Sequence, residues 1–375
     1  MARRHDDHER ARTGAVAPRR AARAARADAP APARSRAGAR LDRRRIERLL
    51  DRFPTLEILV VGDVVLDEYL IGDVSRISPE APVPVVHVRR EATALGGAGN
   101  VVRNVVALGG RCRLCSCIGR DADGDEVMRL LAALGVPGDG VLRVAGRPTT
   151  RKSRVVAQSQ QIVRVDRETH EPLAKSAAKA LAEAVRGAAA TADGAILEDY
   201  GKGLFTRATI RTTMQILADA GVPVAVDPKD ELAPFRGAEL VKPNLREAAL
   251  LAGARDATPR DLPRIAARLR AKLGGAKLAI TRGADGIQLF EGTDPGEGVH
   301  VAAPRREVFD VQGAGDTTIA ALALALRAGA TLREAAVVAN AAAATVVAKV
   351  GTATASRDEV RAQLADAIAV AEASA

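Results

Sequence analysis

Short apolar runs that end in polar residues recur along the chain and alternate with helical patterns. The runs occupy residues 58–62, 194–199, 223–228, 239–244 and 277–283. Amphipathic patterns with helical spacing lie between or beside them, at residues 41–52, 176–190, 207–220 and 331–347. Uninterrupted apolar runs indicate strands buried on both faces, and their alternation with helices predicts an α/β fold with three α/β/α layers around a mostly parallel sheet. Ligands of such sheets lie beyond the carboxyl ends of the strands, where the polar residues of these runs fall.

Two further segments do not follow this alternation. Residues 69–74 and 83–88 are short alternating stretches joined by a proline-containing loop, and residues 151–157 and 161–166 predict a hairpin. Together they predict a small β-sheet lid, formed from about residues 69–90 and 149–167. Because this sheet has a face to bury and no helices of its own, we expect it to close over the ligand site, to pack on a second copy in a homodimer, or both.

The basic charge of the chain is concentrated near its start. The 375-residue chain has a formal charge of +10, and residues 1–45 hold 14 Arg against 5 acidic residues, so the remainder is nearly neutral. The first segment is rich in Ala, Arg and Pro and has almost no large apolar residues. We therefore expect disorder over residues 1–40 and a folded domain over residues 41–375. Because the charge is not on the folded part, we expect no nucleic-acid partner.

The apolar content of the chain is not arranged for secretion or membrane insertion. The sequence has no apolar run of signal-peptide length near its start and no stretch of 18 uncharged apolar residues. We therefore expect a cytoplasmic protein with no membrane partner.

Cys112, Cys115 and Cys117 lie close together in an alternating segment. A metal site is one interpretation, but no fourth Cys or nearby His completes a tetrahedral set. On a strand, Cys115 and Cys117 share one face and Cys112 takes the other. We interpret the three residues as buried thiols of a reducing compartment.

The strongest chemical signal is the segment of small residues Gly313, Ala314 and Gly315, followed by Asp316 and an apolar helical pattern. Small residues let consecutive backbone N–H groups turn toward one point, and the N-terminus of the following helix faces the same point. Such a site stabilises a transferring phosphoryl group, and Asp316 is then placed to accept the proton of an attacking hydroxyl. Alternatively, the segment is a glycine-rich turn in which Asp316 caps the helix.

A second glycine-rich segment precedes another helical pattern. Gly96 and Gly97 would let a polyol approach the backbone closely, and Asn100 offers a donor and an acceptor to neighbouring hydroxyls. A loop-to-helix turn selected for packing is the alternative interpretation.

The order of five motifs identifies a family. Gly-Asp follows the first strand, Gly-Gly-x-x-Asn opens a helix, and Asn-Leu-Arg-Glu, Thr-Arg-Gly and Gly-Ala-Gly-Asp follow at residues 244–247, 281–283 and 313–316. In this order the chain resembles the ribokinase-like carbohydrate kinases over residues 57–356. Residues 61–69, 75–85, 151–166 and 198–203 most resemble the D-glycero-β-D-manno-heptose 7-phosphate kinases within that family.

The resemblance implies a ribokinase-like fold and a reaction. ATP, with Mg²⁺, would phosphorylate the anomeric O1 of heptose 7-phosphate to the 1,7-bisphosphate, a step toward ADP-heptose for the lipopolysaccharide core. Members of this family are often fused to an adenylyltransferase. Because the chain ends soon after Ser356, we expect a separate adenylyltransferase polypeptide.

The resemblance also implies roles for individual residues. Asp316 would be the base, beside the N–H groups of Gly313, Ala314 and Gly315. The nucleotide would be bound by residues that match the family's motifs: Asn244, Leu245, Arg246, Glu247, Thr281, Gly283, Gly286 and Asn340. Glu247 would organise Mg²⁺ through water. Strand-end turns and a helix-face amide remain the alternative for Gly286 and Asn340.

The substrate residues are expected on the other side of the base. They are the acidic residues and amide that match the family, together with cations of the predicted hairpin: Asp63, Asp67, Gly96, Gly97, Asn100, Lys152, Arg154, Arg164 and Asp199. Lys152 and Arg154 lie two apart on a strand, share a face and can converge on one phosphate. Alternatively, these cations protect a solvated edge strand. In that case the chain is a ribokinase-like kinase for another sugar or sugar phosphate.

One residue departs from the family pattern. Gln312 stands where the family usually carries Thr or Ser. The larger amide could crowd the phosphate or alter the packing of the loop, while the N–H donors and the base are retained.

Overall fold

The computed structural model describes residues 40–158, 160–292, 296, 298–349 and 351–374. The disorder predicted for residues 1–40 therefore concerns residues that, apart from Arg40, lie outside the described ones. Within the described ranges, no helix is long and apolar enough to span a membrane.

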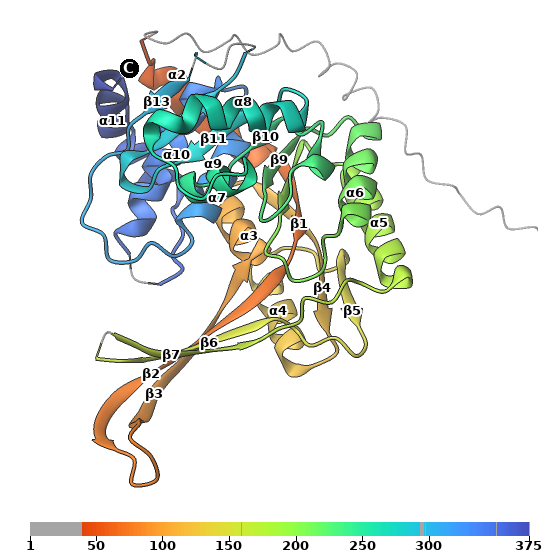
Figure 1. The fold of residues 1–375 in the computed structure, drawn as a ribbon, viewed down its shortest axis with the longest axis vertical. Coiled ribbons are helices and arrows are strands. Elements are labelled where there is room, and N and C mark those ends of the chain that lie inside the picture. Colours follow the sequence, from red (N-terminus) through yellow and green to blue (C-terminus); the bar gives the residue numbers. More distant parts are fainter. Residues whose placement is uncertain (1–39, 159, 293–295, 297, 350, 375) are drawn as a thin grey trace, which may run out of the picture. The chain divides into compact units, whose positions relative to one another are not determined.

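The body of the fold is built on a large sheet. Among the described residues, nine strands follow the order β13-β12-β11-β10-β9-β8-β1-β4-β5 (Figure 1). Neighbours from β11 to β5 are parallel, and the pairs β11–β12 and β12–β13 are antiparallel. The strands are β1 (Glu57–Gly62), β4 (Arg111–Gly119), β5 (Val141–Val144), β8 (Gly194–Glu198), β9 (Val224–Asp227), β10 (Leu240–Val241), β11 (Lys277–Thr281), β12 (Ile287–Phe290) and β13 (Val299–Val301). The predicted α/β class with a mostly parallel sheet is confirmed.

Helices cover both faces of this sheet. They are α2 (Arg43–Asp51), α3 (Ala98–Ala107), α4 (Ala122–Ala133), α5 (Lys175–Ala189), α6 (Arg207–Asp219), α7 (Leu245–Leu251), α8 (Leu262–Leu273), α9 (Ala314–Ala328), α10 (Leu332–Val347) and α11 (Arg357–Ala373). Short 3₁₀ turns add η1 (Phe53–Thr55), η2 (Ala233–Phe235), η3 (Pro259–Asp261) and η4 (Gly283–Asp285).

Strand β1 explains why the apolar runs are uninterrupted. Ile58 and Val60 belong to the core on the side of α2, α3, α9, α10 and α11, whereas Leu59 and Val61 belong to the core on the side of α5 to α8. Successive side chains point to opposite faces, so a strand covered on both sides is apolar at every position. The same alternation separates Cys112 from Cys115, which lie in opposite cores. The thiols are free, and burial raises the pKa of Cys117 to about 11.

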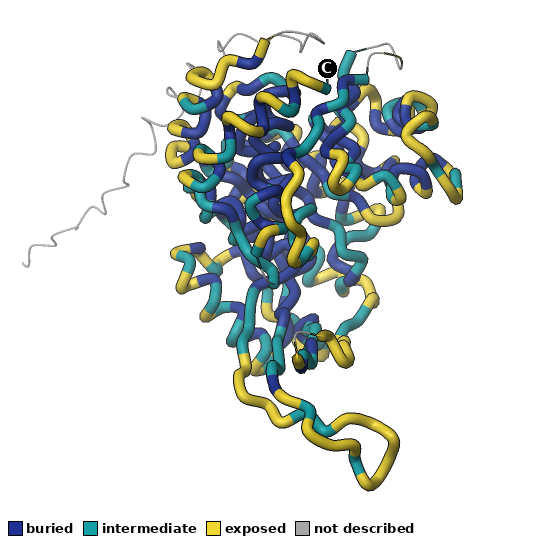
Figure 2. The backbone as a smooth tube through the Cα atoms, turned by 90° about the vertical axis from the view of Figure 1, so that its left-hand side faces the viewer, coloured by how far each residue is buried: buried dark blue, intermediate teal, exposed yellow. Residues whose placement is uncertain are grey.

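A second sheet projects from the body as the lid (Figures 1 and 2). Its described strands follow the order β3-β2-β6-β7, with an antiparallel hairpin at each side and a parallel pairing between β2 and β6. They are β2 (Val64–Ile77), β3 (Pro84–Gly97), β6 (Arg151–Ala157) and β7 (Gln160–Arg167). Strands β2 and β3 are longer than the alternating stretches in the sequence, because their inner ends continue into the core of the body. The expected accessory sheet is present.

Candidate active site

The site is centred on the first turn of α9. The helix begins at Ala314, after Gly313 takes a left-handed φ of 77° as N-cap without a side-chain cap. A side chain at Gly313 would also collide with Asn100, since a Cβ there would lie 2.6 Å from Nδ2. The N–H of Ala314 donates to the carbonyl oxygen of Val311 over 3.4 Å, and the N-terminal end of the helix dipole favours an anion beside this first turn.

Asp316 is buried at this helix start and held by two side chains. Asn100 Nδ2 donates to its Oδ2 over 2.7 Å, and the hydroxyl of Tyr200 donates to its Oδ1 over 2.8 Å. Burial raises the pKa of Asp316, and these two hydrogen bonds oppose the rise because they favour the carboxylate. Asp316 is therefore oriented by other side chains and does not serve as a simple helix cap.

Two cavities of the described chain meet at this acid. One has a volume of about 800 Å³ and lies along the carboxyl ends of β8 to β11 and the start of α9. The other has a volume of about 210 Å³ and lies between the lid and α3. Tyr200, Gly313 and Asp316 line both. We call them the nucleotide cavity and the acceptor cavity.

Most of the residues expected at the nucleotide line the nucleotide cavity. They are Asn244, Glu247, Thr281, Gly283, Gly286, Gly313, Ala314, Gly315 and Asn340. Leu245 and Arg246 do not line it. Leu245, the first residue of α7, is partly buried against the core, and Arg246 is exposed.

The Asn-x-x-Glu segment forms a reciprocal helix cap. The backbone N–H of Asn244 donates to Glu247 Oε2 over 2.8 Å, and the N–H of Glu247 donates to Asn244 Oδ1 over 2.9 Å. This capping box satisfies the first N–H groups of α7 and fixes Glu247 at the wall of the cavity.

Gly286 and Asn340 shape the same cavity from its other end. Gly286 has a φ of 90°, and a Cβ there would lie 2.3 Å from the carbonyl oxygen of Val301. Asn340 is buried and donates to the carbonyl oxygens of Val301 and Ala302 over 2.9 and 3.1 Å. Both residues therefore hold the chain that follows β13 against the cavity wall.

The sequence analysis missed a buried cluster of charges at the floor of the nucleotide cavity. Lys242 lies at the end of β10 and pairs with Asp227 at the end of β9 over 2.6 Å. A Cβ on Gly315 would lie 3.5 Å from Lys242 Nζ, so this cation lies directly beside the start of α9. Burial favours neutral lysine, but the carboxylates of Asp227 and Glu198 outweigh it and raise the pKa of Lys242. In the sequence both residues follow apolar runs, but their pairing across two strands is visible only in the structure.

The two carboxyl groups of this cluster are held in a dry environment. Burial raises the pKa of Asp227 to about 7, against the lowering effect of Lys242. Burial also raises the pKa of Glu198, with the negative charge of Asp227 as the next cause. Glu198 Oε2 is buried and has no hydrogen-bond partner among the described residues.

The carboxylate oxygens around this cluster fit a divalent cation that also binds phosphate oxygens. Mg²⁺ takes oxygen ligands and usually combines one or two carboxylates with water and phosphate oxygens. Glu247, Asp227 and Glu198 line the nucleotide cavity, and Glu198 has an unpaired oxygen there. Within the described ranges no group of three or more such side chains is close enough to hold an ion alone. An ion at this place would therefore depend on the phosphates for much of its coordination.

The acceptor cavity gathers most of the residues expected at the substrate. They are Asp67, Gly96, Gly97, Asn100, Lys152, Arg154 and Arg164. Gly96 makes room for Asp67, because a Cβ there would lie 2.2 Å from Oδ2 of that carboxylate. Lys152 and Arg154 do share a face of β6, and Arg164 lies opposite Arg154 on β7.

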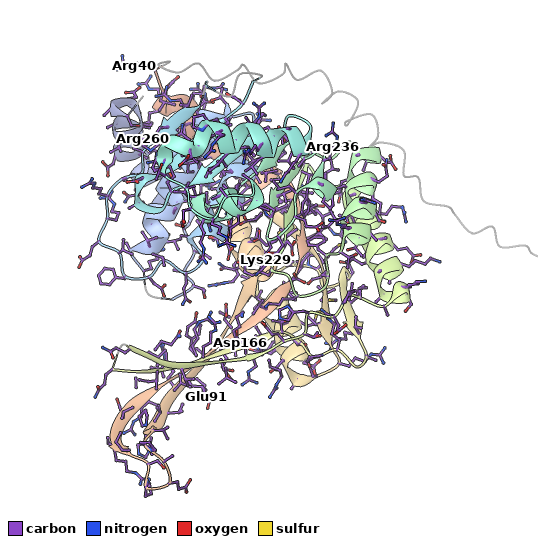
Figure 3. The ribbon with its side chains drawn as sticks, in the orientation of Figure 1. Arg40, Glu91, Asp166, Lys229, Arg236 and Arg260 are labelled. Carbon is purple, nitrogen blue, oxygen red and sulfur yellow. The ribbon has the colours of Figure 1, made fainter. Side chains whose placement is uncertain are left out.

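Each cation of the acceptor cavity also contacts a carboxylate. Arg154 pairs with Asp67 over 2.6 Å, and Lys152 and Arg164 both contact Asp166, each over 2.9 Å. Asp166 lies on the lid and Lys229 on the body, at a wall of the nucleotide cavity (Figure 3). The wall of the acceptor cavity thus combines cations with the carboxylates that pair with them.

Asp63 and Asp199, which were expected at the substrate, do not line the acceptor cavity. Asp63 is buried and accepts hydrogen bonds from the N–H groups of Tyr200 at 3.2 Å, Lys202 at 3.0 Å and Leu204 at 3.2 Å. It anchors the loop after β8, because a carboxylate is a strong acceptor for turned backbone N–H groups. Asp199 lines the nucleotide cavity instead, and burial raises its pKa to about 6.

Tyr200 is a further residue that was not assigned from the sequence. The Asp63 anchor sets the loop so that the Tyr200 hydroxyl reaches Asp316. Nothing in its spacing signals this contact, since Tyr200 lies 116 positions from its partner.

The family follows from a comparison with known proteins. Residues 55–359 match the model of the pfkB family of carbohydrate kinases. The chain belongs to the pfkB family of carbohydrate kinases. It is therefore a carbohydrate kinase, the class expected from its motifs.

Curated relatives and solved structures support this membership. The chain is 44% identical over 316 residues, or 84% of its length, to the bifunctional protein HldE of Desulfatibacillum aliphaticivorans. It is 42% identical over 309 residues, or 82% of its length, to the bifunctional protein HldE of Mesorhizobium japonicum. Phosphofructokinase-2 from Escherichia coli, in complex with potassium, has a TM-score of 0.69 at 23% identity, covering 83% of this chain and 99% of that one. Arabidopsis thaliana ribokinase, complexed with ribose and ATP, has a TM-score of 0.65 at 22% identity, covering 82% and 98%. The solved structures confirm the ribokinase-like fold.

The curated relatives are longer than the part matched here. The chain spans 64% of the Desulfatibacillum protein and 62% of the Mesorhizobium protein. Both are named bifunctional, so these comparisons give no support to the expectation of a separate adenylyltransferase.

Proposed function

We propose that this pfkB-family kinase transfers the γ-phosphoryl group of ATP to the anomeric O1 of D-glycero-β-D-manno-heptose 7-phosphate, in a cytoplasmic route to ADP-heptose for lipopolysaccharide. The observation that carries the proposal is the position of Asp316 between the two cavities. A phosphate donor in the larger cavity and a sugar in the smaller one would meet at this carboxylate.

The transfer needs a base at the attacking hydroxyl. Asp316 accepts the O1 proton as the sugar oxygen bonds to the γ-phosphorus, and the bond from that phosphorus to the β–γ bridging oxygen breaks to release ADP. Asn100 and Tyr200 hold the two carboxylate oxygens, so the acid is oriented before the substrate arrives. A base that is already oriented raises the rate, because less conformational entropy is lost on reaching the transition state.

Negative charge on the transferring group is stabilised by the start of α9. Gly313, Ala314 and Gly315 line the nucleotide cavity, and this end of α9 and the ammonium group of Lys242 would lie beside the γ-phosphate. Fixed donors in a cavity with little water are effective for this purpose. Mg²⁺, bound by Glu247 and its neighbours, would neutralise further phosphate charge.

The 7-phosphate would be bound by the lid. Lys152, Arg154 and Arg164 converge on the acceptor cavity, where they can exchange part of their contact with Asp67 and Asp166 for phosphate oxygens. Asp67 and Asp166 already neutralise these cations, so the cavity could also suit a sugar without a phosphate at this place. This favours a second candidate, a kinase for another sugar or sugar phosphate.

A substrate panel decides between these candidates. Heptose 7-phosphate, the unphosphorylated heptose, ribose and fructose 1-phosphate are assayed with ATP and Mg²⁺. We expect heptose 7-phosphate to have the highest kcat/KM of the panel, at least about 100-fold above heptose and ribose, since two or more charge-assisted bonds are lost without the phosphate. A preference for ribose or for the unphosphorylated heptose would contradict the heptose 7-phosphate assignment and support the second candidate.

We also propose a homodimer through the lid. Apolar residues lie on the surface of this sheet, among them Ile77, Val83, Val163 and Val165, which are 60%, 52%, 48% and 58% exposed. Figure 2 shows the outer part of the lid as mostly exposed. A second copy would cover this apolar surface.

A further inference from the structure

One residue that lines the acceptor cavity has a buried polar atom that the reaction does not use. Gln312 lines this cavity beside Asp316, but it does not line the nucleotide cavity. Its Oε1 is buried and has no hydrogen-bond partner among the described residues. The backbone is fixed separately, because the Gln312 N–H donates to Asp310 Oδ1 over 2.9 Å. The amide of Gln312 is thus part of the wall of the acceptor cavity, and no other described residue holds its oxygen.

A second residue that lines the same cavity also has an unpartnered polar atom, and this atom is a donor. Arg154 is 9% exposed, and its Nε is buried without a partner within the described chain. The rest of its guanidinium is held, since an Nη donates to Asp67 over 2.6 Å and the group lies 5.5 Å from the centre of the Tyr69 ring. Two residues that line the acceptor cavity thus each carry a polar atom without a partner among the described residues, an acceptor at Gln312 and a charged donor at Arg154.

Unpaired buried polar groups are costly and are usually satisfied by a ligand or by water. A polyol phosphate satisfies both groups here, because its hydroxyls donate and its oxygens accept. The proton of the reacting hydroxyl goes to Asp316, which both cavities share. The contact to Gln312 must then come from another hydroxyl on the same side of the sugar.

We propose that Gln312 is a specificity-determining residue, whose Oε1 accepts a hydrogen bond from a non-reacting hydroxyl of the sugar. This inference rests on the proposed function and deepens it. It also reverses the expectation from the sequence, in which the large amide crowds the phosphate. The two interpretations predict opposite effects for Gln312→Thr, which introduces the residue type usual in the family.

The test compares the wild-type chain with Gln312→Met, which keeps the length of the side chain without its acceptor, and with Gln312→Thr. Steady-state constants are measured for heptose 7-phosphate and for ATP. We expect both variants to raise KM for the sugar phosphate by about 5- to 30-fold, the effect of one lost hydrogen bond in a buried site, with KM for ATP changed less than about 2-fold. A lower sugar KM or a higher kcat in Gln312→Thr would show crowding and overturn the inference. So would an unchanged sugar KM in Gln312→Met.

The proposed reaction could fail while this inference stands. If the wild-type chain phosphorylates no sugar of the panel, the reaction is wrong, and the comparison is made by calorimetric binding of heptose 7-phosphate. Binding that is about 5- to 30-fold weaker in Gln312→Met supports the role of Gln312. Equal binding by both proteins, or binding by neither, overturns it.

Discussion

The hydroxyl of Tyr200 lies 2.8 Å from Oδ1 of Asp316 and donates a hydrogen bond to it. The bond links the loop after β8 to the first turn of α9, and both residues line both cavities. Asn100 holds the other oxygen of the same carboxylate. The acid at the centre of the site is therefore positioned by two elements that are far apart in the sequence.

Asp316→Asn should reduce kcat by about 10²- to 10⁴-fold, the range for loss of a general base. Asparagine has a similar shape but cannot accept the proton. Binding of a non-hydrolysable ATP analogue, measured by calorimetry, should change little because the N–H groups of α9 remain. Turnover within a few-fold of the wild-type value would refute the assignment of the base.

Tyr200→Phe should make activity more sensitive to acid. Burial raises the pKa of Asp316 and the Tyr200 bond opposes that rise, so its loss moves the pKa further upward. The base must be ionised, and the acidic limb of the kcat/KM profile should move to higher pH, with a greater loss at pH 6 than at pH 8. Tyr69→Phe is the matched control, because its buried hydroxyl has no partner in the described chain. An identical limb in Tyr200→Phe and wild type would exclude the positioning role.

The sequence predicted the fold and pointed to the two glycine-rich segments, at residues 96–100 and 313–316, because both depend on local patterns. Apolar runs mark β1 and β8 to β11, and the small residues before Asp316 mark the start of α9. Lys242 and Tyr200 were missed as functional residues because their roles come from tertiary contacts to Asp227 and Asp316. The anchoring contacts of Asp63 could not be predicted for the same reason, since its partners are backbone N–H groups 137 to 141 positions away.

Lys152→Ala combined with Arg154→Ala should raise KM for a phosphorylated sugar by about 10- to 100-fold and KM for ATP by less than about 3-fold. Both cations line the acceptor cavity and neither lines the nucleotide cavity. Arg89→Ala is the control, because Arg89 is a lid cation that is 72% exposed and pairs with Asp73. Equal increases for both substrates would count against phosphate recognition. Thermal melting is recorded in parallel, since Arg154→Ala leaves Asp67 buried without its cation.

Asp199→Asn should change how stability depends on pH. Burial raises the pKa of Asp199 from 3.8 to about 6, so between these values the folded chain holds a proton that the unfolded chain has lost. This group therefore lowers the free energy of unfolding of the wild type as pH rises through that window. Asparagine does not titrate, so the variant should gain stability relative to wild type between pH 4 and pH 7, as measured by urea unfolding. A constant difference across that range would show that the pKa is not raised.

The lid should hold two copies of the chain together, through the face that turns away from the site. Arg164 lines the acceptor cavity, so Val163 and Val165, on either side of it in β7, lie on the opposite face. They are 48% and 58% exposed, and a charge there would cost free energy in a dimer and little in a monomer. We expect the wild type to sediment as a dimer at micromolar concentration and Val163→Glu with Val165→Glu to sediment as a monomer. Leu250→Glu, at an apolar residue of α7 that is 55% exposed, should leave the dimer intact. A monomeric wild type at that concentration would rule out this interface, while loss of the dimer in Leu250→Glu would place the contact on the body.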